Sequence, residues 1–305
     1  QLHRRQRQMC IRDSIRIKVK LITKPTKGNL NIYFMKNNSL ISLRSQEPEG
    51  GILYIVGTPI GNLNDISSRA INILQNVSLV ACEDTRQTKK IMNKYKISNN
   101  LISFHKHNSL RRIPKIVEDL KGGKSIALVS DAGMPGICDP GEDIVKAVKL
   151  KGFDVICVPG ACAALTALVS SGLPSSSFVF EGFLPKKKSD RKKVLLEICN
   201  NEKTTIIYES PHRLKQLLEE LYELCGGTRK IEIGRELTKK FEEHIGNNIN
   251  DAISFFKDKE IHGEITIVLN GENKKKDLEF NHSDLKKELN AVSYTHLTLP
   301  TMELV

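Results

Sequence analysis

The feature that most restricts the fold is an alternation of short apolar runs and helical patterns along residues 53–170. The apolar runs end in glycine, proline or polar residues, and they predict buried strands at residues 53–56, 77–82, 101–104, 125–130 and 154–158. Between these runs, apolar residues recur at helical spacing. This spacing predicts helices after Asp65 or Ser67 and near residues 87–95, 111–120, 141–151 and 161–170. Strands that alternate with helices in this way indicate a parallel sheet covered by helices on both faces.

A second unit of the same kind follows a basic segment, FLPKKKSDRKK, at residues 183–193. Beyond it the pattern predicts helices near residues 191–200, 212–224 and 248–256, and strands at residues 204–208, 230–234 and 264–269. The predicted fold class is therefore α/β with two α/β domains. We expect an N-terminal domain over residues 51–182, a basic linker over residues 183–193 and a C-terminal domain over residues 194–271.

The two ends of the chain show no such pattern. Residues 1–50 lack sustained periodicity, do not begin with methionine and contain no apolar core of a signal peptide. The opening QLHRRQRQMCIRDS and the closing AVSYTHLTLPTMELV are similar to translated adapter sequence. We therefore expect the leader (residues 1–50) and the tail (residues 272–305) to lie outside the folded domains, and residues 1–34 and 292–305 to be dispensable. The alternative is that the leader is a basic RNA-binding arm.

The net charge of +12 says little about the folded part, because most of it lies in the leader. Residues 1–50 hold 11 lysines and arginines against 3 acidic residues, and residues 272–305 hold 5 against 6. The remaining 31 against 26 leave residues 51–271 with a net charge of +5, so composition alone does not indicate a nucleic-acid ligand. The most apolar stretch, residues 155–169, is interrupted by Pro159 and Gly160 and is shorter than the roughly 18–20 residues that cross a bilayer. No membrane contact is expected.

Cysteine usage predicts a reduced, cytoplasmic protein. The chain has seven cysteines at scattered spacings and no C-x-x-C pair. Several stand inside apolar runs, where a free cysteine packs as a small apolar side chain. Neither a catalytic thiol nor a metal site is expected.

The chemistry is expected in the loops that follow the predicted strands, because ligands of open parallel sheets bind outside the carboxyl ends of the strands. The glycines of the first loop do not match the G-x-G-x-x-G dinucleotide fingerprint, and no Walker A loop is present. From the residues alone, the pattern indicates a small ligand that the backbone approaches closely. The five loops are GTPIGN at 57–62, EDTR at 83–86, HKHN at 105–108, DAGMP at 131–135 and PGACA at 159–163.

Eight strings in these and neighbouring positions occur in a family's order: LYIVGTPIGNLNDIS, ACEDTR, FHKHN, ALVSDAGMPGICDPG, VPGACAALTAL, EGFLP, YESPHR and GRELTK. Over residues 53–271 the chain thereby resembles the ribosomal RNA small-subunit methyltransferase I group. This group lies within the tetrapyrrole-methylase-like class of S-adenosylmethionine enzymes. One departure is Met134, where the family's SDAGTP string has threonine.

The resemblance implies a fold of the tetrapyrrole-methylase type with S-adenosylmethionine in the cleft between the two domains. It also implies methylation of the 2'-hydroxyl of a cytidine in the decoding region of 16S rRNA. The expected partner is 16S rRNA or the small ribosomal subunit, and the expected assembly is a cytoplasmic homodimer. No metal is expected, because a sulfonium methyl is already activated and the protein mainly has to orient the reactants.

Asp131 is the strongest cofactor-binding prediction, because it ends a buried strand beside Gly133. The alternative is that Asp131 only caps the next loop. Gly160, Ala161 and Cys162 are small enough for the backbone to meet an adenine or a ribose, or for a helix to pack tightly. Correspondence with the class adds Ile60, Met134, Tyr208, Glu209, Glu236, Leu237 and Glu264.

Polar residues at strand ends are candidates for proton transfer and RNA contact. The predicted catalytic residues are Glu83, Asp84, His105 and His107, because a carboxylate or a neutral imidazole accepts a proton. The predicted RNA-binding residues are Arg86, Asn108 and Arg213, with the basic run 186–193 as a further phosphate contact. The alternatives are loop hydrogen bonds for the histidines, an ion pair between Arg86 and Glu83 or Asp84, and a solvated linker.

Two other functions stay open at this point. One is a corrinoid or tetrapyrrole C-methyltransferase, which the strings EDTR, FHKHN and YESPHR disfavour. The other is an RNA-binding assembly factor that keeps the fold without turnover. Incubation with labelled S-adenosylmethionine and small-subunit particles distinguishes the three.

Overall fold

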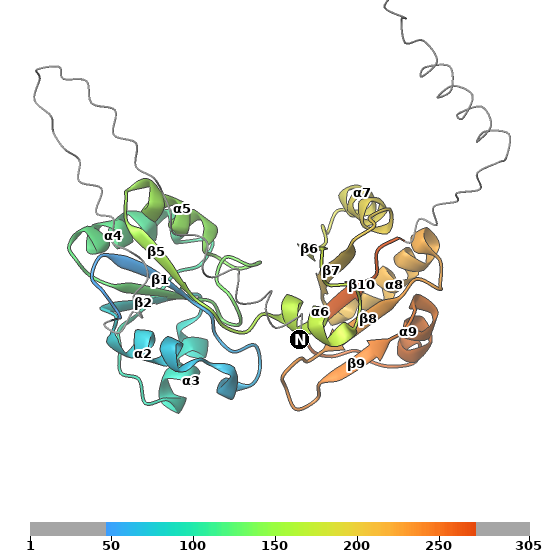
Figure 1. Cartoon of the computed structure of the whole chain (residues 1–305), viewed down its shortest axis with the longest axis horizontal. Helices are drawn as coiled ribbons and strands as arrows, with labels where there is room; N and C mark the ends of the chain where they lie inside the picture. The colour runs from blue at the N-terminus through green and yellow to red at the C-terminus, as the bar shows by residue number, and fades with distance from the viewer. Residues whose placement is uncertain (1–46, 273–305) are drawn as a thin grey trace, which may run out of the picture. The chain divides into compact units, whose positions relative to one another are not determined.

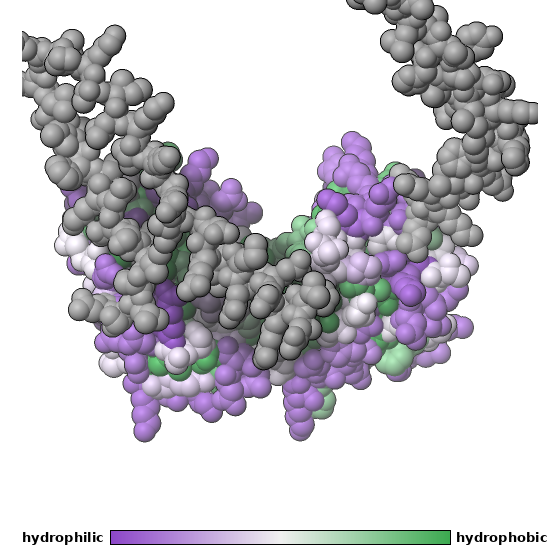
Figure 2. All heavy atoms as spheres, in the orientation of Figure 1, coloured by the Kyte–Doolittle hydropathy of each residue, from purple (hydrophilic) through white to green (hydrophobic). Residues whose placement is uncertain are grey.

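The computed structural model describes residues 47–272, which form two sheets with their helices (Figure 1). The expectations for residues 1–46 and 273–305 lie outside this range. Within residues 47–272, no helix is long and apolar enough to cross a membrane. On the face drawn in Figure 2, hydrophilic residues cover most of the visible surface of this range, with smaller hydrophobic patches between them.

The first sheet is entirely parallel, as predicted, with the strand order β3-β2-β4-β1-β5. Its strands are β1 (Ile52–Val56), β2 (Leu79–Cys82), β3 (Leu101–Ser103), β4 (Ile126–Val129) and β5 (Asp154–Val158). Because all five strands run in the same direction, their carboxyl ends and the loops that follow them gather at one edge of the sheet.

Four helices cover this sheet, two on each face (Figure 1). Along β1, Tyr54 and Val56 face the helices on one side, while Leu53 and Ile55 face those on the other, as the period of two in a strand requires. All five residues of β1 are buried, which explains its continuous apolar run. The helices are α2 (Ser68–Asn76) and α3 (Thr85–Lys94) on the first face, and α4 (Ser109–Lys121) and α5 (Glu142–Leu150) on the second.

The second sheet is mixed, with the strand order β6-β7-β10-β8-β9. Only β6 and β7 are parallel, and the other three pairs are antiparallel. Its strands are β6 (Phe178–Phe183), β7 (Thr204–Glu209), β8 (Ile231–Arg235), β9 (Glu243–Gly246) and β10 (Ile265–Leu269).

The main core of this second unit lies between one face of the sheet and three helices, α7 (Lys188–Cys199), α8 (Pro211–Cys225) and α9 (Ile249–Phe256). The other face packs against α6 (Ala163–Ser171), where Ile206 and Val268 contact Ala167 and Leu168 within one apolar cluster. The sheet is therefore covered on both faces, although by unequal numbers of helices.

Five segments differ from the sequence-based expectation. The strand β9 was not predicted. Residues 47–50, expected to belong to the leader, are part of the folded range, where Glu47 is buried and pairs with Arg69 at 2.7 Å. The strand β6 was not predicted, and it pairs with β7 in the second sheet although nearly all of it lies before residue 183. The helix α6, placed by its sequence position in the first unit, packs on the second sheet. The basic run 188–193 forms the first turns of α7 rather than an irregular connection.

The expectation of reduced cysteines is wrong for one pair. A disulfide joins Cys199, the last residue of α7, to Cys225, the last residue of α8. The two helices pack side by side on the same sheet face and bring the two Cα atoms to 5.6 Å, within the usual range for a disulfide.

Two glycines bring the loops after β1 and β5 into direct backbone contact. A Cβ on Gly57 would lie 2.6 Å from the Cα of Gly160, and a Cβ on Gly160 would lie 2.7 Å from the Cα of Gly57. Real Cβ contacts are not this short, so any larger residue at either position forces the two loops apart. These positions therefore require glycine for the close approach of backbone to backbone.

We expect Gly57→Ala to lower the free energy of unfolding by about 1–3 kcal/mol, the usual cost of overpacking. Urea denaturation measures this change. Gly122→Ala is the matched control, because a Cβ there meets its nearest atom at an ordinary 3.4 Å, and we expect it to leave stability unchanged or slightly raised. Equal stability of the two variants would contradict the importance of the contact between Gly57 and Gly160.

Candidate functional site

A cavity of about 370 Å³ opens at the carboxyl ends of the first sheet, beside the loop after β4 and the last residues of β7. This volume lies within the range of small-molecule sites, which is roughly 300–1,000 Å³. The cavity is mainly apolar, with a few carboxylates and hydroxyls. Its lining residues are Ile60, Ala132, Gly133, Met134, Ile137, Cys138, Asp139, Cys162, Ala163, Phe183, Tyr208, Glu209, Ser210, Pro211, Gly263, Glu264, Ile265 and Thr266.

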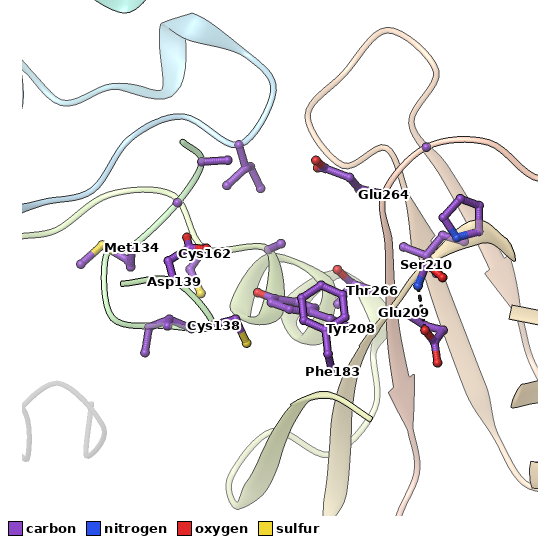
Figure 3. A pocket seen from close by; sticks show the side chains of 18 residues that line it. Met134, Cys138, Asp139, Cys162, Phe183, Tyr208, Glu209, Ser210, Glu264 and Thr266 are labelled. Atoms are coloured by element: carbon purple, nitrogen blue, oxygen red, sulfur yellow. Dashed lines mark hydrogen bonds between the residues drawn. The ribbon is translucent and has the colours of Figure 1, made fainter. Parts of the chain in front are cut away.

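Figure 3 shows how the cavity is built from two groups of side chains. Met134, Cys138 and Asp139 lie on the loop after β4, with Cys162 close by at the start of α6. Tyr208 and Thr266 face them from β7 and β10 of the second sheet. The predicted cofactor residues Ile60, Gly133, Met134, Cys162, Tyr208, Glu209 and Glu264 are therefore brought together at one cavity.

Backbone geometry shapes the floor of the cavity. The N–H of Thr58 donates to the carbonyl of Gly133 at 2.9 Å, and the N–H of Gly133 donates back at 3.1 Å. Gly133 has φ +81°, a left-handed conformation that suits glycine and exposes backbone without a side chain in the way. The sulfur of Met134 lies against Gly57, so the residue that departs from the family string fills space beside the contact between Gly57 and Gly160.

Asp131 does not line the cavity, although it was the strongest cofactor prediction. Its Oδ1 accepts the N–H of Asp84 at 2.9 Å, which links the end of β4 to the end of β2. Gly160 and Ala161 also lie outside the lining, and Gly160 serves the backbone contact with Gly57. Asp131 and Gly160 thus make internal contacts and do not line the cavity, and their contact with the cofactor stays a prediction.

Two carboxyl groups, those of Glu83 and Asp139, have raised pKa values. Burial raises the pKa of Glu83 above its ordinary value, and the charges of Asp139 and Asp131 raise it further. Burial also raises the pKa of Asp139, with a smaller contribution from the charge of Asp131. Asp139 lines the cavity directly and was missed by the sequence analysis, although it stands inside the string ALVSDAGMPGICDPG. A carboxylate with a raised pKa beside a cavity is suited to proton transfer.

Asp84 is a poor candidate for a base because Arg86 neutralises it. The guanidinium of Arg86 donates to both carboxylate oxygens of Asp84, at 2.7 Å from Nη2 to Oδ2 and 3.1 Å from Nε to Oδ1. These hydrogen bonds lower the pKa of Asp84 to about 2. The predicted ion pair within EDTR is therefore confirmed for Asp84, while the side chain of Arg86 stays 87% exposed.

The HKHN loop holds itself together. The side chain of Asn108 accepts the N–H of His105 at 2.9 Å and lies 3.1 Å from the Nε2 of that histidine. His107 stands edge-on to the ring of His105, with centroids 6.0 Å apart. Asn108 is buried and also donates to the carbonyl and hydroxyl oxygens of Ser103. His105 and Asn108 thus have structural partners, and neither they nor His107 line the cavity.

Tyr208 supports the cavity and the start of α6 together. Its hydroxyl oxygen accepts the N–H of Ala164 at 3.0 Å and so satisfies a backbone donor in the first turn of a helix whose N-cap side chain makes no hydrogen bond. The ring meets Phe180 and Phe183 edge to face. Burial raises the pKa of Tyr208, so the phenol stays neutral and keeps this position at physiological pH.

Glu209 lines the cavity, but its oxygens are already occupied. Oε2 pairs with Arg191 Nη1 at 3.0 Å and with Arg213 Nη2 at 3.4 Å, and Oε1 accepts the N–H of Ser210 at 2.9 Å (Figure 3). The side chains of Arg191 and Glu209 are almost fully buried. Arg213 also donates to the carbonyls of Leu184 and Pro185, so its guanidinium fixes the end of β6. Arg191 and Arg213 therefore act inside the fold, contrary to the expectation that they meet phosphates.

The predicted residues of the GRELTK string separate in the structure. Glu264 lines the cavity and is 74% exposed, whereas Leu237 is buried in the cluster with Ile60. The carboxylate of Glu236 accepts from Lys239 Nζ at 2.8 Å and from the N–H of Glu264 at 2.9 Å. Of these three residues, only Glu264 is placed to meet a ligand in the cavity.

No group of three or more histidine, cysteine, aspartate or glutamate side chains is placed to hold a metal ion within residues 47–272. The apolar lining and the carboxylates on separate loops instead fit an organic ligand.

A family model for Tetrapyrrole (Corrin/Porphyrin) Methylases matches residues 52–252 of the chain. The chain belongs to this family, and within it to the group of proteins named ribosomal RNA small subunit methyltransferase I. Two members of that group are a protein of Halalkalibacterium halodurans, 45% identical over 75% of this chain and 79% of its own length, and one of Bacillus subtilis, 49% identical over 73% and 76%. The resemblance inferred from the eight strings is therefore confirmed.

Solved structures of the family share the fold. A cobalt precorrin-4 methyltransferase aligns with a TM-score of 0.57 and 15% identity over 72% of this chain and 95% of its own. A uroporphyrin-III C-methyltransferase from Thermus thermophilus, complexed with S-adenyl homocysteine, aligns with a TM-score of 0.50 and 13% identity over 71% of this chain and 96% of its own. These likenesses confirm the α/β fold class.

The buried ion pair between Arg191 and Glu209 is expected to stabilise the second unit. Arg191→Met leaves the buried Glu209 carboxylate without its closest cation, and losing one partner of a buried pair typically costs about 3–5 kcal/mol of stability. Urea denaturation of Arg191→Met and of the exposed control Lys192→Met measures the difference, and we expect the control to change by less than about 0.5 kcal/mol. Arg191 also pairs with the partly exposed Glu220 at 2.7 Å, so the double variant Arg191→Met with Glu209→Gln should recover only the part of the loss that comes from the buried Glu209. A failure to recover any would contradict the ion pair with Glu209.

Glu83→Gln should change stability in a pH-dependent direction. The pKa of Glu83 is raised in the fold, so the folded state favours the protonated carboxyl group. The resulting contribution to the free energy of unfolding is fully present below the ordinary glutamate pKa and is lost as the pH rises through the raised pKa. Glutamine stays neutral throughout, so the melting temperature of the variant relative to the parent should rise as the pH increases from the ordinary glutamate pKa through the raised pKa of Glu83. A difference that stays constant with pH would show that Glu83 ionises normally.

Proposed function

We propose that this chain transfers a methyl group from S-adenosylmethionine to the 2'-hydroxyl of a cytidine in 16S rRNA. The observation that carries the proposal is a mainly apolar cavity at the carboxyl ends of parallel strands, in a chain 45–49% identical to proteins named ribosomal RNA small subunit methyltransferase I. The choice of a ribose oxygen of a cytidine rests on the sequence resemblance, and the carboxylates beside the cavity support chemistry that removes a proton.

The residues at the cavity fit S-adenosylmethionine. Ile60, Met134 and Ala163 offer apolar surface for an adenine. Gly133, which has no side chain, lets a polar group of the cofactor approach its backbone in the same cavity. Asp139 and Glu264 provide carboxylates near a cavity that would receive a cationic ligand. When bound, S-adenosylmethionine supplies a methyl group on a positively charged sulfur.

The protein's own task is then to orient the ribose and accept one proton. A Glu83 carboxylate oxygen accepts the proton of the attacking hydroxyl, because its raised pKa brings its basicity closer to neutral pH than that of Asp84. Asp139 supports this role, since its charge raises the pKa of Glu83 and its own side chain borders the cavity.

The proposed partner is 16S rRNA or the small subunit, the proposed compartment is the cytoplasm, and the proposed assembly is a homodimer. In support of a dimer, Leu165 and Val169 expose apolar side chains on α6, at 49% and 79%. Burial of such side chains stabilises an interface between two copies. Light scattering of the purified chain tests the proposed assembly.

The decisive experiment incubates the protein with labelled S-adenosylmethionine and three acceptors: small-subunit particles, naked 16S rRNA and a tetrapyrrole. Label in a single cytidine of 16S rRNA, stable to alkali at its 3'-phosphodiester, supports the proposal because a 2'-O-methyl group blocks alkaline cleavage at that bond. Label in the tetrapyrrole would identify a C-methyltransferase. RNA binding without label would identify an assembly factor.

The pH dependence of methylation tests Glu83 as the base. The wild-type rate should rise with pH through the raised pKa of Glu83, because only the carboxylate form accepts a proton. Glu83→Gln should lower kcat by about 10²-fold or more and remove this limb of the profile. Cofactor affinity by calorimetry should stay within about threefold, or less than 1 kcal/mol, because Glu83 does not line the cavity.

Asp84→Asn is the control for this experiment, since Asp84 is ion-paired and has a pKa of about 2. It should retain the pH dependence of the parent. A Glu83→Gln variant that keeps both its rate and its pH profile would remove Glu83 from the mechanism.

A further inference from the structure

One segment of the folded part carries an extreme charge. Residues 85–117 contain nine lysines and arginines and no aspartate or glutamate. Since residues 51–271 have a net charge of only +5, the remainder of that range has a net charge of −4. The basic residues are Arg86, Lys89, Lys90, Lys94, Lys96, Lys106, Arg111, Arg112 and Lys115.

This segment forms one border of the first sheet. It comprises α3, β3 and most of α4, and β3 is the outermost strand, paired only with β2 among the described strands. The helix α3 covers one face of the sheet and α4 the other, so the segment wraps around the sheet border. Nearly all of its cations are exposed. We call this surface, residues 85–117, the basic edge.

Two hollows flank β3, one toward each helix. The first, about 660 Å³, is lined by Lys89, Asn93 and Asn100 among others. The second, about 210 Å³, is lined by Arg112, Lys115 and Lys124 together with apolar residues. The carboxylate in this lining, that of Asp119, forms an ion pair with Lys124, with Nζ at 2.7 Å from Oδ1. Each hollow thus offers positive charge that no carboxylate of its own lining neutralises.

Arg112 gives a second, independent indication of a ligand. Its Nε is buried and has no hydrogen-bond partner among the described residues. A buried guanidinium N–H without an acceptor is costly, and an anion seated in the hollow would supply one.

The basic edge also lies close to the proposed reaction site. The strand β2 separates β3 from β4, so the ends of β3 and β4 are two strand spacings, roughly 10 Å, apart. Glu83 and Arg86 follow β2, and the loop 105–108 follows β3, so the polar loops continue from the cavity region onto the basic edge.

We propose that the basic edge binds the phosphate backbone of the RNA whose ribose enters the site beside Glu83 and Asp139. The inference rests on the proposed function for the identity of the RNA. Phosphate contacts supply most of the non-specific affinity for nucleic acid, and they need cations without competing carboxylates. The centre of a protein interface is instead depleted of lysine, so an acidic protein partner fits this surface less well. The amides of Asn93 and Asn100 offer hydrogen bonds to ribose and base edges.

The test compares two variants in which five exposed cations become glutamine. The edge variant carries Lys89→Gln, Lys94→Gln, Lys96→Gln, Arg111→Gln and Lys115→Gln. The control variant carries Lys146→Gln, Lys149→Gln, Lys151→Gln, Lys203→Gln and Lys230→Gln, on and near α5 and directly before β7 and β8, and it changes the net charge equally. All ten positions are exposed, so both variants should melt within a few degrees of the parent.

Binding of a fluorescent RNA fragment from the small-subunit decoding region is measured from low to moderate salt. We expect the edge variant to bind the RNA at least tenfold more weakly than the parent. The slope of the logarithm of the binding constant against the logarithm of the salt concentration should become shallower by about 0.7–0.9 for each phosphate that the protein no longer neutralises. The control variant should keep the parent slope. Calorimetry with S-adenosylmethionine should give the same affinity for all three proteins, because none of the ten residues lines the cavity.

Equal loss of affinity in both variants, or an unchanged slope in the edge variant, would overturn the proposal. If the edge variant kept its RNA affinity but alone lost binding to poly-glutamate, the basic edge would be assigned to an acidic protein, which also overturns it. The parent protein could methylate no RNA while the edge variant alone shows the reduced salt slope. This result would refute the proposed function but would still support RNA binding by the basic edge. The two proposals therefore fail separately.

Discussion

The close approach of Gly57 to Gly160 is the constraint on which the site depends. It holds the loops after β1 and β5 in backbone contact, and the paired hydrogen bonds between Thr58 and Gly133 add the loop after β4. Three strand ends of one sheet thus form a continuous floor, with Met134 packed against it. Because Gly57 and Gly160 lie outside the cavity lining, their contact acts on the site through neighbouring residues that do line it, Ile60, Gly133 and Met134.

The second sheet supplies the opposing wall, and polar side chains fix its position by internal contacts. Tyr208 satisfies the first turn of α6, and Glu209 is neutralised by Arg191 and Arg213. Arg191 also pairs with Glu220 at 2.7 Å, so two cations face two carboxylates at this wall, although Glu209 borders the cavity. Of the remaining carboxylates at the cavity, Glu264 is exposed and pairs with Lys239 Nζ at 3.1 Å, whereas burial raises the pKa of Asp139.

Sequence periodicity predicts the first sheet well, because β1 and β4 are buried on both faces and read as continuous apolar runs. It misses β6 and β9, which lie at the borders of the second sheet. Exposed residues interrupt their patterns, and β6 contains a register shift near Gly182. The packing of α6 on the second sheet is also invisible to periodicity, since a helix made of small apolar residues fits either sheet.

At the site, the type of a residue predicted where it lies in the fold better than it predicted which contacts its side chain makes. Glycines and small residues marked the correct loops, but the same carboxylates and arginines that suit ligand binding also suit internal pairing. Glu209, Arg213 and Asp131 make internal contacts, because the fold brings each of them next to a partner that is distant in sequence. These partners are Arg191, the carbonyl of Leu184 and the N–H of Asp84, respectively. Asp139 lines the cavity, and only its place inside a matched string distinguished it from an ordinary loop aspartate.

Charge shows the same dependence on placement. A folded part of modest net charge appears neutral toward nucleic acid when its residues are summed, yet residues 85–117 concentrate nine cations around one sheet border. Coulomb interactions between exposed charges are screened over about 8 Å at physiological ionic strength, so a phosphate senses the local surface rather than the sum over the chain. The acidic surplus elsewhere keeps the total low without weakening that border. The two proposals together separate two tasks in space: the carboxyl ends of the parallel strands border the proposed small-ligand site, and the outermost strand lies among the cations proposed to bind the RNA backbone.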